Sequence, residues 1–275
     1  MIAQKRALIK RVMDSSNQSS NSKSEIILEA IDLSKSFGGL KAVDNASIQV
    51  KANSITGLIG PNGAGKSTLF NLLANFFPAD SGDVLFNGQS IVATPPHRIA
   101  RQGFLRTFQV ARVLSRLTVL ENMLLGTQQQ AGENLLSVII QPQKIRREEK
   151  ENKEKALSIL ESVGLIDKAY DYAGALSGGQ RKLLEMARTL MTNPKLVLLD
   201  EPAAGVNPTL INQICEHIVN WNKMGISFLI IEHNMDVIMS LCSHVWVLAE
   251  GANLADGTPE EIQNNETVLS AYLGD

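Results

Sequence analysis

The sequence predicts an α/β fold: a mostly parallel β-sheet covered by helices on both faces, with an N-terminal antiparallel β subdomain and an α-helical insertion. Three observations lead to this prediction. Short apolar runs alternate with helical patterns toward both ends of the chain, a glycine-rich loop joins one such run to a helix, and residues 110–192 show no strand pattern. Strands that alternate with helices typically form a parallel sheet buried on both faces.

The composition is typical of a globular protein with a substantial core. The chain has 275 residues, 44% of them hydrophobic, and a formal net charge of -2. Such a length buries most of its apolar surface without staples, and the near-neutral charge argues against a nucleic-acid partner. Because no apolar run approaches the roughly 18 to 20 residues of a membrane span, we expect the chain to cross no bilayer and to serve a membrane process only through partners.

We expect residues 1–24 to be a flexible tail and residues 25–275 to form one nucleotide-binding domain. The tail is rich in serine and asparagine, a composition that cannot support a core. A short basic amphipathic helix over residues 7–13 is the alternative for part of it. No long apolar segment follows the N-terminal basic residues, so we do not expect the tail to be a secretory signal. Cys215 and Cys242 lie in separate apolar segments, as buried thiols do.

The first third of the domain predicts mostly strands, with two helices among them. Residues 26–31 and 46–50 are expected to be strands joined through a turn at Gly38-Gly39. The expected elements that follow are a strand at 54–59, a helix at 66–75, a strand at 82–86 closed by a turn at Asn87-Gly88, a short helix at 97–102 and a strand at 104–108.

The rest of the domain predicts a helical insertion, followed again by strands that alternate with helices. Helical spacing covers 118–125, 146–162 and 181–192, all inside the insertion at about 110–192. In the second of these helices Ala156, Leu157 and Leu160 are expected to face inward. After the insertion we expect strands at 196–199, 227–231, 244–248 and 253–255, with helices at 209–223 and 235–241.

Residues 60–67 match the G-x-x-x-x-G-K-[ST] pattern of a phosphate-binding loop. Glycines let backbone N–H groups wrap a polyphosphate, because no side chain blocks its approach and unusual φ values are allowed. The next helix would point its N-terminus at the phosphates. Lys66 is expected to reach the β- and γ-phosphates, and the Ser67 hydroxyl to bind Mg²⁺.

Two acids end the apolar strand at 196–199. Asp200 is expected to face the same crevice as the phosphate loop and to hold and orient Mg²⁺ through water. Glu201 would point to another side and accept a proton from the attacking water. Two further polar side chains follow strands: Gln109, which could contact the metal or the water, and His233, which could bond the γ-phosphate or position the water.

A second glycine-containing helix start lies at Leu176-Ser-Gly-Gly-Gln180. Ser177 is a good N-cap, and Gly178 and Gly179 leave backbone N–H groups exposed. One chain has no need for two γ-phosphate sites, whereas two chains arranged head to tail do. Each chain would then cap the nucleotide held by the other.

This string resembles the signature of ABC ATPases, and the order of the motifs matches theirs over about residues 26–273. The resemblance implies a P-loop NTPase core with the ABC ATPase fold, ATP and Mg²⁺ as cofactors, and ATP hydrolysis as the activity. It also implies the residues that bind ATP, including an aromatic that stacks on adenine: Phe37, Gly60, Pro61, Asn62, Gly63, Ala64, Gly65, Lys66, Ser67, Thr68, Ser177, Gly178, Gly179 and Gln180.

The resemblance extends to the catalytic residues. Glu201, His233 and Gln109 correspond to the catalytic glutamate, the switch histidine and the Q-loop glutamine. Ser67, Gln109 and Asp200 correspond to the residues around the metal. The segment after the glutamate commonly ends in Leu-Asp-Pro, but here Asn207 stands in place of that aspartate. We expect this change to tune communication between the two sites without inactivating them.

Four stretches, 107–114, 117–123, 201–208 and 257–274, are similar to the ATPases of branched-chain and neutral amino acid importers. The resemblance implies three kinds of partner: a second ATPase subunit, either homologous or identical; two membrane permeases; and, indirectly, a periplasmic-type binding protein. It also implies a peripheral location on the cytoplasmic face of the inner membrane. The urea and amide importer ATPases are close alternatives. A non-transport ABC ATPase, a kinase or GTPase sharing only the phosphate loop, and a non-hydrolysing subunit are more distant ones.

Overall fold

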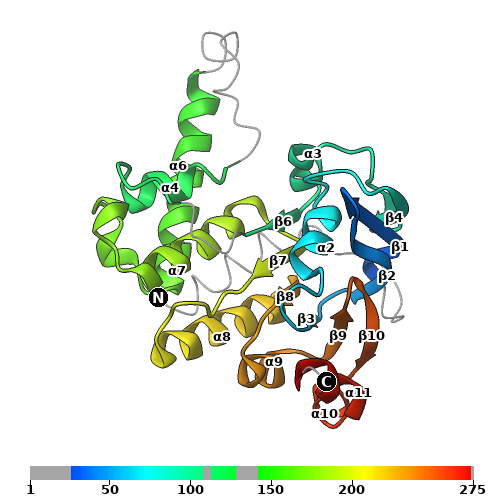
Figure 1. Cartoon of the computed structure of the whole chain (residues 1–275). Helices are drawn as coiled ribbons and strands as arrows, with labels where there is room; N and C mark the ends of the chain where they lie inside the picture. The colour runs from blue at the N-terminus through cyan, green and yellow to red at the C-terminus, as the bar shows by residue number, and fades with distance from the viewer. Residues whose placement is uncertain (1–25, 108–112, 128–141, 274–275) are drawn as a thin grey trace.

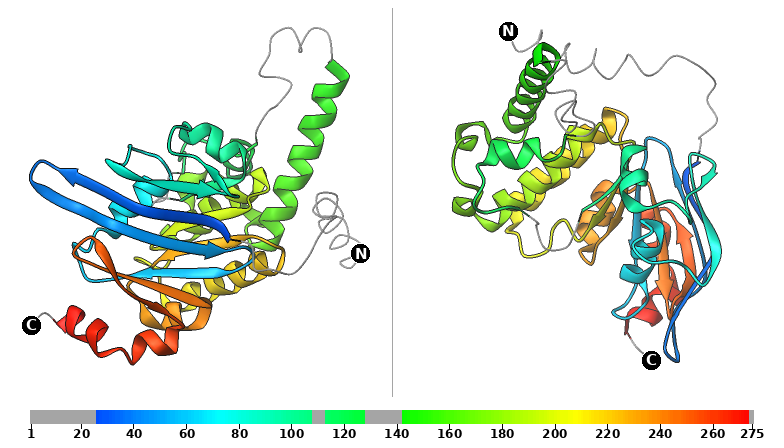
Figure 2. Two further views of the ribbon diagram at one scale, coloured as in Figure 1. Left: turned by 90° about the vertical axis from the view of Figure 1, so that its right-hand side faces the viewer. Right: turned by 90° about the horizontal axis from the view of Figure 1, so that it is seen from above.

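The computed structural model describes residues 26–107, 113–127 and 142–273. The expected tail at 1–24 and Gln109 lie outside these ranges. Within them, two β-sheets pack against each other and helices cover the free face of the second sheet (Figures 1 and 2). The predicted fold class is confirmed.

The first sheet is antiparallel, with the strand order β2-β1-β4-β5. Its strands are β1 (Ile26–Phe37), β2 (Leu40–Lys51), β4 (Ser81–Phe86) and β5 (Gln89–Ser90). Both long strands run well beyond the expected 26–31 and 46–50. Asp32 and Asn45 adopt positive φ angles of 47° and 49°, and the register shifts beside them. Such irregularities break the two-residue alternation, which hides the continuation of the strands from the sequence.

The second sheet has six strands in the order β10-β9-β3-β8-β7-β6. They are β3 (Ile55–Ile59), β6 (Phe104–Arg106), β7 (Leu196–Asp200), β8 (Ser227–Ile231), β9 (His244–Ala249) and β10 (Ala252–Gly257). All neighbours pair in parallel except β9 and β10. The carboxyl ends of β3, β6, β7 and β8 therefore meet at one edge of the sheet, where the predicted site residues lie.

The side chains of β7 show how this sheet separates two cores. Leu196 and Leu198 pack with the first sheet and α2, whereas Val197 and Leu199 pack with the helices on the other face. All four are essentially inaccessible to solvent. Because successive strand residues point to opposite faces, a continuous apolar run is what a doubly covered strand requires.

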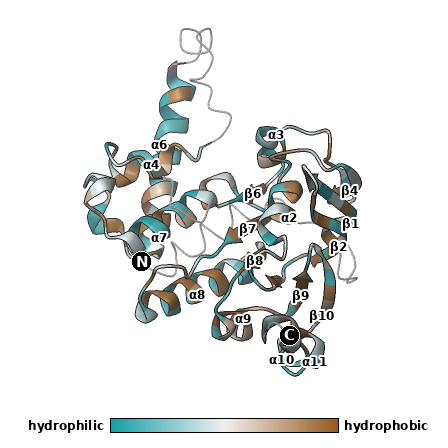
Figure 3. Ribbon diagram, viewed as in Figure 1, coloured by the Kyte–Doolittle hydropathy of each residue, from teal (hydrophilic) through white to brown (hydrophobic). Residues whose placement is uncertain are grey.

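Helices fill the described part of the insertion, which contains no strand. They are α4 (Val119–Leu124), α6 (Pro142–Ser162) and α7 (Gly178–Thr189), with short 3₁₀ turns at Ile166–Lys168, Ala173–Ala175 and Leu190–Thr192. Ala156 and Leu160 of α6 are fully buried, as predicted, and Leu157 is partly buried. One end of α6 projects from the body and carries mostly hydrophilic residues (Figures 1 and 3).

The remaining helices are α2 (Lys66–Leu73), α3 (Pro96–Arg101), α8 (Pro208–Lys223), α9 (Met235–Leu241), α10 (Pro259–Gln263) and α11 (Glu266–Leu273). In the described residues no helix is both long enough and apolar enough to span a membrane. Burial raises the pKa of the Cys242 thiol to about 12, in keeping with a core cysteine.

Candidate functional site

The loop between β3 and α2 presents a helix start without a side-chain cap. Gly65 precedes α2 in the left-handed region at φ 92°, and no side chain caps the first turn. By contrast, side chains cap the starts of α4, α7, α8 and α10. The first N–H groups of a helix lack intrahelical acceptors, so the α2 start offers its donors and its positive dipole end to an anion.

Gly60 and Gly65 adopt the unusual φ angles expected of them, 150° and 92°, and the structure adds a second reason for glycine at both positions. A Cβ at Gly60 would strike the carbonyl oxygen of Leu248, and one at Gly65 would strike that of Ala42. These two positions therefore need glycine because the loop packs against the backbone of β9 and β2. A Cβ at Gly63 would meet nothing within 4 Å, so only there is the expected open side of the loop present.

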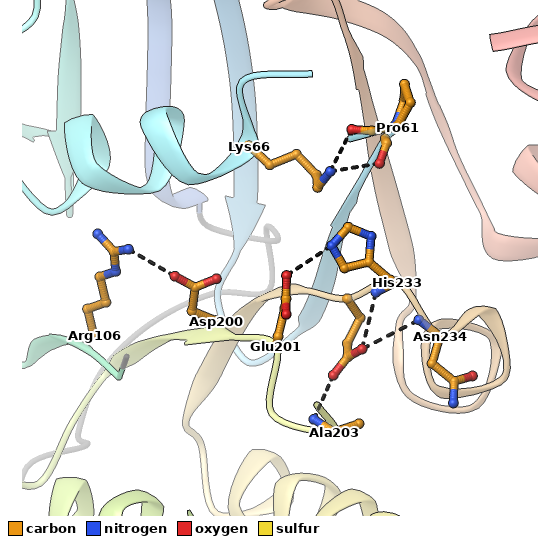
Figure 4. Close-up of polar contacts among 10 residues, drawn as sticks. Pro61, Lys66, Arg106, Asp200, Glu201, Ala203, His233 and Asn234 are labelled. Atoms are coloured by element: carbon orange, nitrogen blue, oxygen red, sulfur yellow. Dashed lines mark hydrogen bonds and ion pairs between the residues drawn. The ribbon is translucent and has the colours of Figure 1, made fainter. Parts of the chain in front are cut away.

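Lys66 is folded back onto its own loop. Its Nζ donates hydrogen bonds to the carbonyl oxygens of Gly60 at 2.7 Å and Pro61 at 2.9 Å (Figure 4). Burial lowers the pKa of this ammonium, and the negative charge of Glu201 opposes part of the shift. Ser67, Asn62 and Gly63 are exposed around it. A cation held only by carbonyl dipoles can be transferred to phosphate oxygens.

The two acids at the end of β7 have different partners, as predicted from their adjacent positions. An Oδ2 atom of Asp200 accepts a hydrogen bond from Nη2 of Arg106 at 3.0 Å. Glu201 leaves the strand with φ at 48°, and its Oε1 lies 2.9 Å from Nε2 of His233 (Figure 4). Parallel strands thus bring a carboxylate and an imidazole together at the edge that also carries Lys66.

Sequence reasoning missed Glu232, which fixes this pair. It is only 4% exposed, its Oε1 accepts the Ala203 N–H at 2.7 Å, and its Oε2 accepts the His233 N–H at 3.2 Å. One buried carboxylate therefore ties the segment after Glu201 to the segment that carries the imidazole. The only available signal was an acid placed directly after a fully apolar strand.

Lys182 of α7 was also missed. It is 5% exposed, and burial lowers the pKa of its ammonium, while the charges of Glu185, Asp200 and Glu232 act in the opposite direction. The lysine lies two residues after Gln180, so the helix that starts at the second glycine motif also carries a buried cation toward the acids of the site.

The second helix start is built differently from the first. Ser177 caps α7 and forms a capping box with Gln180: Oγ accepts the Gln180 N–H at 3.2 Å, and Gln180 Oε1 accepts the Ser177 N–H at 3.0 Å. Gly178 is exposed with nothing within 4 Å of an added Cβ, whereas a Cβ at Gly179 would strike the Leu210 side chain. Gly178 is therefore the position that faces open space.

The two helix starts lie on opposite faces of the six-stranded sheet. Buried residues of α2 belong to the core beside the first sheet, and those of α7 belong to the core on the helical face. Figure 1 shows the two helices on either side of β7 and β8. Within one chain, the structure thus keeps Ser177 and Gly178 apart from the group formed by Lys66, Asp200, Glu201 and His233.

Phe37 and Asn207 have clear local environments. The Phe37 ring is 49% exposed at the end of β1, and its inner edge packs on Phe77 at 5.6 Å. The Oδ1 atom of Asn207 accepts the Leu210 N–H at 2.9 Å and caps α8. Asparagine and aspartate cap equally well, so the unusual Asn207 keeps the local structure that an aspartate would give.

No group of three or more histidine, cysteine or acidic side chains that could hold a metal occurs in residues 26–107, 113–127 and 142–273. A protein cage is therefore absent from these ranges. The available oxygens, from the Ser67 hydroxyl and the Asp200 carboxylate, instead suit an ion such as Mg²⁺ that takes most of its ligands from phosphate and water.

Comparisons with known proteins agree with this geometry. Residues 43–204 match the family model described as "ABC transporter", and residues 252–275 match the one described as "Branched-chain amino acid ATP-binding cassette transporter".

Individual relatives cover nearly the whole chain. It is 45% identical over 248 residues to a probable branched-chain amino acid transport ATP-binding protein LivG of Archaeoglobus fulgidus, covering 90% of this chain and 95% of that protein. It is 39% identical to LivG of Escherichia coli K12, covering 92% and 99%. A crystal structure of a nucleotide-free ATP-binding cassette from an ABC transporter superposes with a TM-score of 0.79 at 41% identity, covering 91% and 100%.

Proposed function

This chain belongs to the ABC transporter ATP-binding family, and from that premise we propose that it powers an importer of branched-chain or neutral amino acids. It is an ATPase, as its family and its structural relatives require. The match of residues 252–275 to a branched-chain amino acid cassette model supports the cargo class, as do the names of relatives that cover 90% or more of the chain.

ATP would be bound by the loop of residues 60–68 and by Phe37. The uncapped start of α2 supplies N–H donors, and Lys66 would exchange its two carbonyl partners for the β- and γ-phosphates. The exposed ring of Phe37 would stack on adenine. Ser67 and Asp200, with Gln109, would hold Mg²⁺, which when bound offsets the charge that develops on the phosphates.

Glu201 would act as the general base for the attacking water. The observation that carries this role is the 2.9 Å contact between Glu201 and His233, beside the phosphate loop and away from the partner of Asp200. The imidazole orients the carboxylate beside the phosphate loop, where the attacking water would lie. Because phosphoryl transfer depends mainly on positioning and charge stabilisation, these residues need only hold the water in line.

A second ATPase subunit, identical or homologous, would complete each site with Ser177, Gly178, Gly179 and Gln180. The open space at Gly178 supports a role toward a partner. Two permeases would receive the motion of the helical insertion, and a periplasmic-type binding protein would deliver cargo to them. The subunit would therefore work at the cytoplasmic face of the inner membrane.

The Glu201→Gln variant tests this assignment. We expect turnover to fall by about 100-fold to 10,000-fold, the usual contribution of a positioned base, while ATP binding stays near wild type. Phosphate release and equilibrium nucleotide binding would be measured side by side, with the exposed Glu216→Gln of α8 as the matched control. Turnover near the wild-type rate would contradict the proposed base.

The cargo is tested separately with the permeases present. Proteoliposomes that contain the complete transporter should accumulate labelled leucine or a neutral amino acid in an ATP-dependent manner. Accumulation of urea or amides alone would replace the proposed cargo without affecting the assignment of the ATPase site.

A further inference from the structure

Arg106 occupies a buried position between the phosphate-loop helix and the acids at the end of β7. It is the last residue of β6, and its side chain is only 7% exposed. The guanidinium donates from Nη2 to Asp200 Oδ2 at 3.0 Å, and the Asp200 side chain is only 10% exposed (Figure 4). Removing one partner of a charge pair this deeply buried would leave the other charge uncompensated.

A second hydrogen bond connects the same guanidinium to α2. Its Nη1 donates to Asn71 Oδ1 at 2.7 Å, and Asn71 Nδ2 donates to the carbonyl oxygen of Ser67 at 2.8 Å. Three hydrogen bonds therefore run from Ser67 through Asn71 and Arg106 to Asp200. Ser67 and Asp200, at the two ends of this series of hydrogen bonds, are the two described residues that would hold the magnesium ion.

Two aromatic rings hold the guanidinium in place. Its central carbon lies 5.6 Å from the ring centre of Phe70 and 5.4 Å from that of Phe76. Phe70 is fully buried. A planar, weakly hydrated guanidinium can stack on rings while its fork bonds two separate acceptors, which a lysine ammonium cannot reproduce. The site therefore requires arginine for its shape as well as for its charge.

We propose that Arg106 is a positioning residue of the metal–nucleotide site, which sets the spacing of Ser67 and Asp200 and makes divalent metal bind with the triphosphate rather than before it. This inference rests on the proposed function, in particular on Asp200 as a metal residue. The three hydrogen bonds set the spacing of Ser67 and Asp200, because they fix α2 relative to the end of β7.

The order of binding follows from the charges. The Asp200 carboxylate is already paired with the guanidinium, and the buried Lys182 is a further cation close enough to interact with its charge. A metal ion alone would therefore meet an Asp200 carboxylate whose charge is already offset. A bound triphosphate adds several negative charges and reverses this balance.

Two variants separate spacing from charge. Arg106→Lys keeps the positive charge but loses the fork, and Arg106→Gln loses both. Arg101→Gln, on the exposed side of α3, is the matched control. Binding of Mn²⁺, used as a probe visible by electron paramagnetic resonance, would be measured on the protein alone. Binding of a non-hydrolysable ATP analogue would be measured with and without Mg²⁺.

For Arg106→Gln we expect Mn²⁺ to bind the protein alone at least about 10-fold tighter than it binds wild type, which corresponds to about 1.4 kcal/mol. For Arg106→Lys we expect no such gain. In both variants the factor by which Mg²⁺ tightens analogue binding should fall at least about 10-fold. Arg101→Gln should match wild type in every measurement.

Thermal unfolding would show which variants are folded, and Arg106→Lys carries the test if Arg106→Gln is not. An unchanged Mg²⁺ effect in a folded Arg106→Lys protein would overturn the inference and leave Arg106 as a structural residue. If Mg²⁺ fails to tighten analogue binding even in wild type, or if Asp200→Asn leaves its effect intact, the proposed metal site is wrong, and the inference fails with it.

Discussion

Two helices of this chain, α2 and α7, begin beside glycines, and they differ in whether a side chain caps the first turn. The start of α2 has no side-chain cap, and Lys66 bends over it. The start of α7 is closed by a reciprocal Ser177–Gln180 capping box and faces open space at Gly178. Side chains satisfy some donors of α7 but none at the start of α2, so the α2 start keeps its donors available for an anion bound by its own chain. We propose that the capped α7 start, with Gly178 facing open space, instead contacts a phosphate held by a partner subunit.

The largest effect should come from removing the cation of the first helix start. Lys66→Ala is expected to weaken ATP binding by roughly 100-fold or more, the equivalent of about 3 kcal/mol for a charge-assisted pair with phosphate. Equilibrium binding of a fluorescent ATP analogue measures this, with the exposed Lys223→Ala of α8 as control. If Lys66→Ala bound ATP within a factor of about two of wild type, the α2 start would not be the nucleotide site, and the contrast drawn between the two helix starts would be wrong.

The two glycines of α7 should respond differently to alanine. Gly178→Ala adds a methyl group in open space, so the fold should stay intact while turnover falls by about 10-fold to 100-fold, because the methyl lies where the partner's phosphate would sit. Gly179→Ala presses on Leu210 and should cost about 1 to 3 kcal/mol of stability. Urea unfolding and steady-state ATPase assays separate the two outcomes. Full activity of Gly178→Ala would argue that this surface meets no nucleotide.

A smaller effect is expected at Asn207, whose cap begins the helix that packs on Gly179. Asn207→Ala should lower the free energy of unfolding by about 1 kcal/mol, and Asn207→Asp should be nearly neutral. Chemical denaturation of both variants measures the difference. Equal losses in the two variants would show that the cap is not the source of the effect.

The last prediction concerns the far end of the α7 segment. Lys155 donates to the Met191 carbonyl oxygen at 2.8 Å and to Asn193 Oδ1 at 2.7 Å, and burial lowers its pKa from 10.5 to about 8. Between these values the unfolded chain holds more protons, so stability should rise as pH increases from about 8 to 10.5. The cost of the buried charge is fully present below about pH 8.

Lys155→Met should remove this part of the pH dependence. Unfolding midpoints of the variant and of wild type would be compared at the two ends of that pH range. If the pH dependence of stability disappears in the variant, Lys155 is the group that titrates in this range, as its burial requires. An identical slope in both proteins would assign the dependence to other groups.

How much could be predicted from the sequence depends on how far apart along the chain the interacting residues lie. The loop of residues 60–67 and the acids Asp200 and Glu201 could be found because motif and neighbouring strand lie within a few residues of each other. The Arg106–Asp200 pair joins residues 94 positions apart, and the Glu232–Ala203 bond joins residues 29 apart. Such partners depend on which strands become neighbours, and sequence pattern alone does not specify that order.

The strand ends show the same limit in local structure. The extension of β1 was hidden because Asp32 breaks the alternation by a positive φ angle, and although aspartate is enriched at such angles, the residue type alone does not specify one. The reason for Gly60 also needed the fold, because the carbonyl that crowds it belongs to Leu248, far along the chain.

The most direct test of the partner-completed site is a structure of the Glu201→Gln variant with Mg·ATP and its ATPase partner. We predict that Ser177 and the Gly178 N–H of one subunit lie within hydrogen-bonding distance of the γ-phosphate held by the phosphate loop of the other. A nucleotide-bound structure in which Ser177 faces solvent, far from any phosphate in either subunit, would contradict this account.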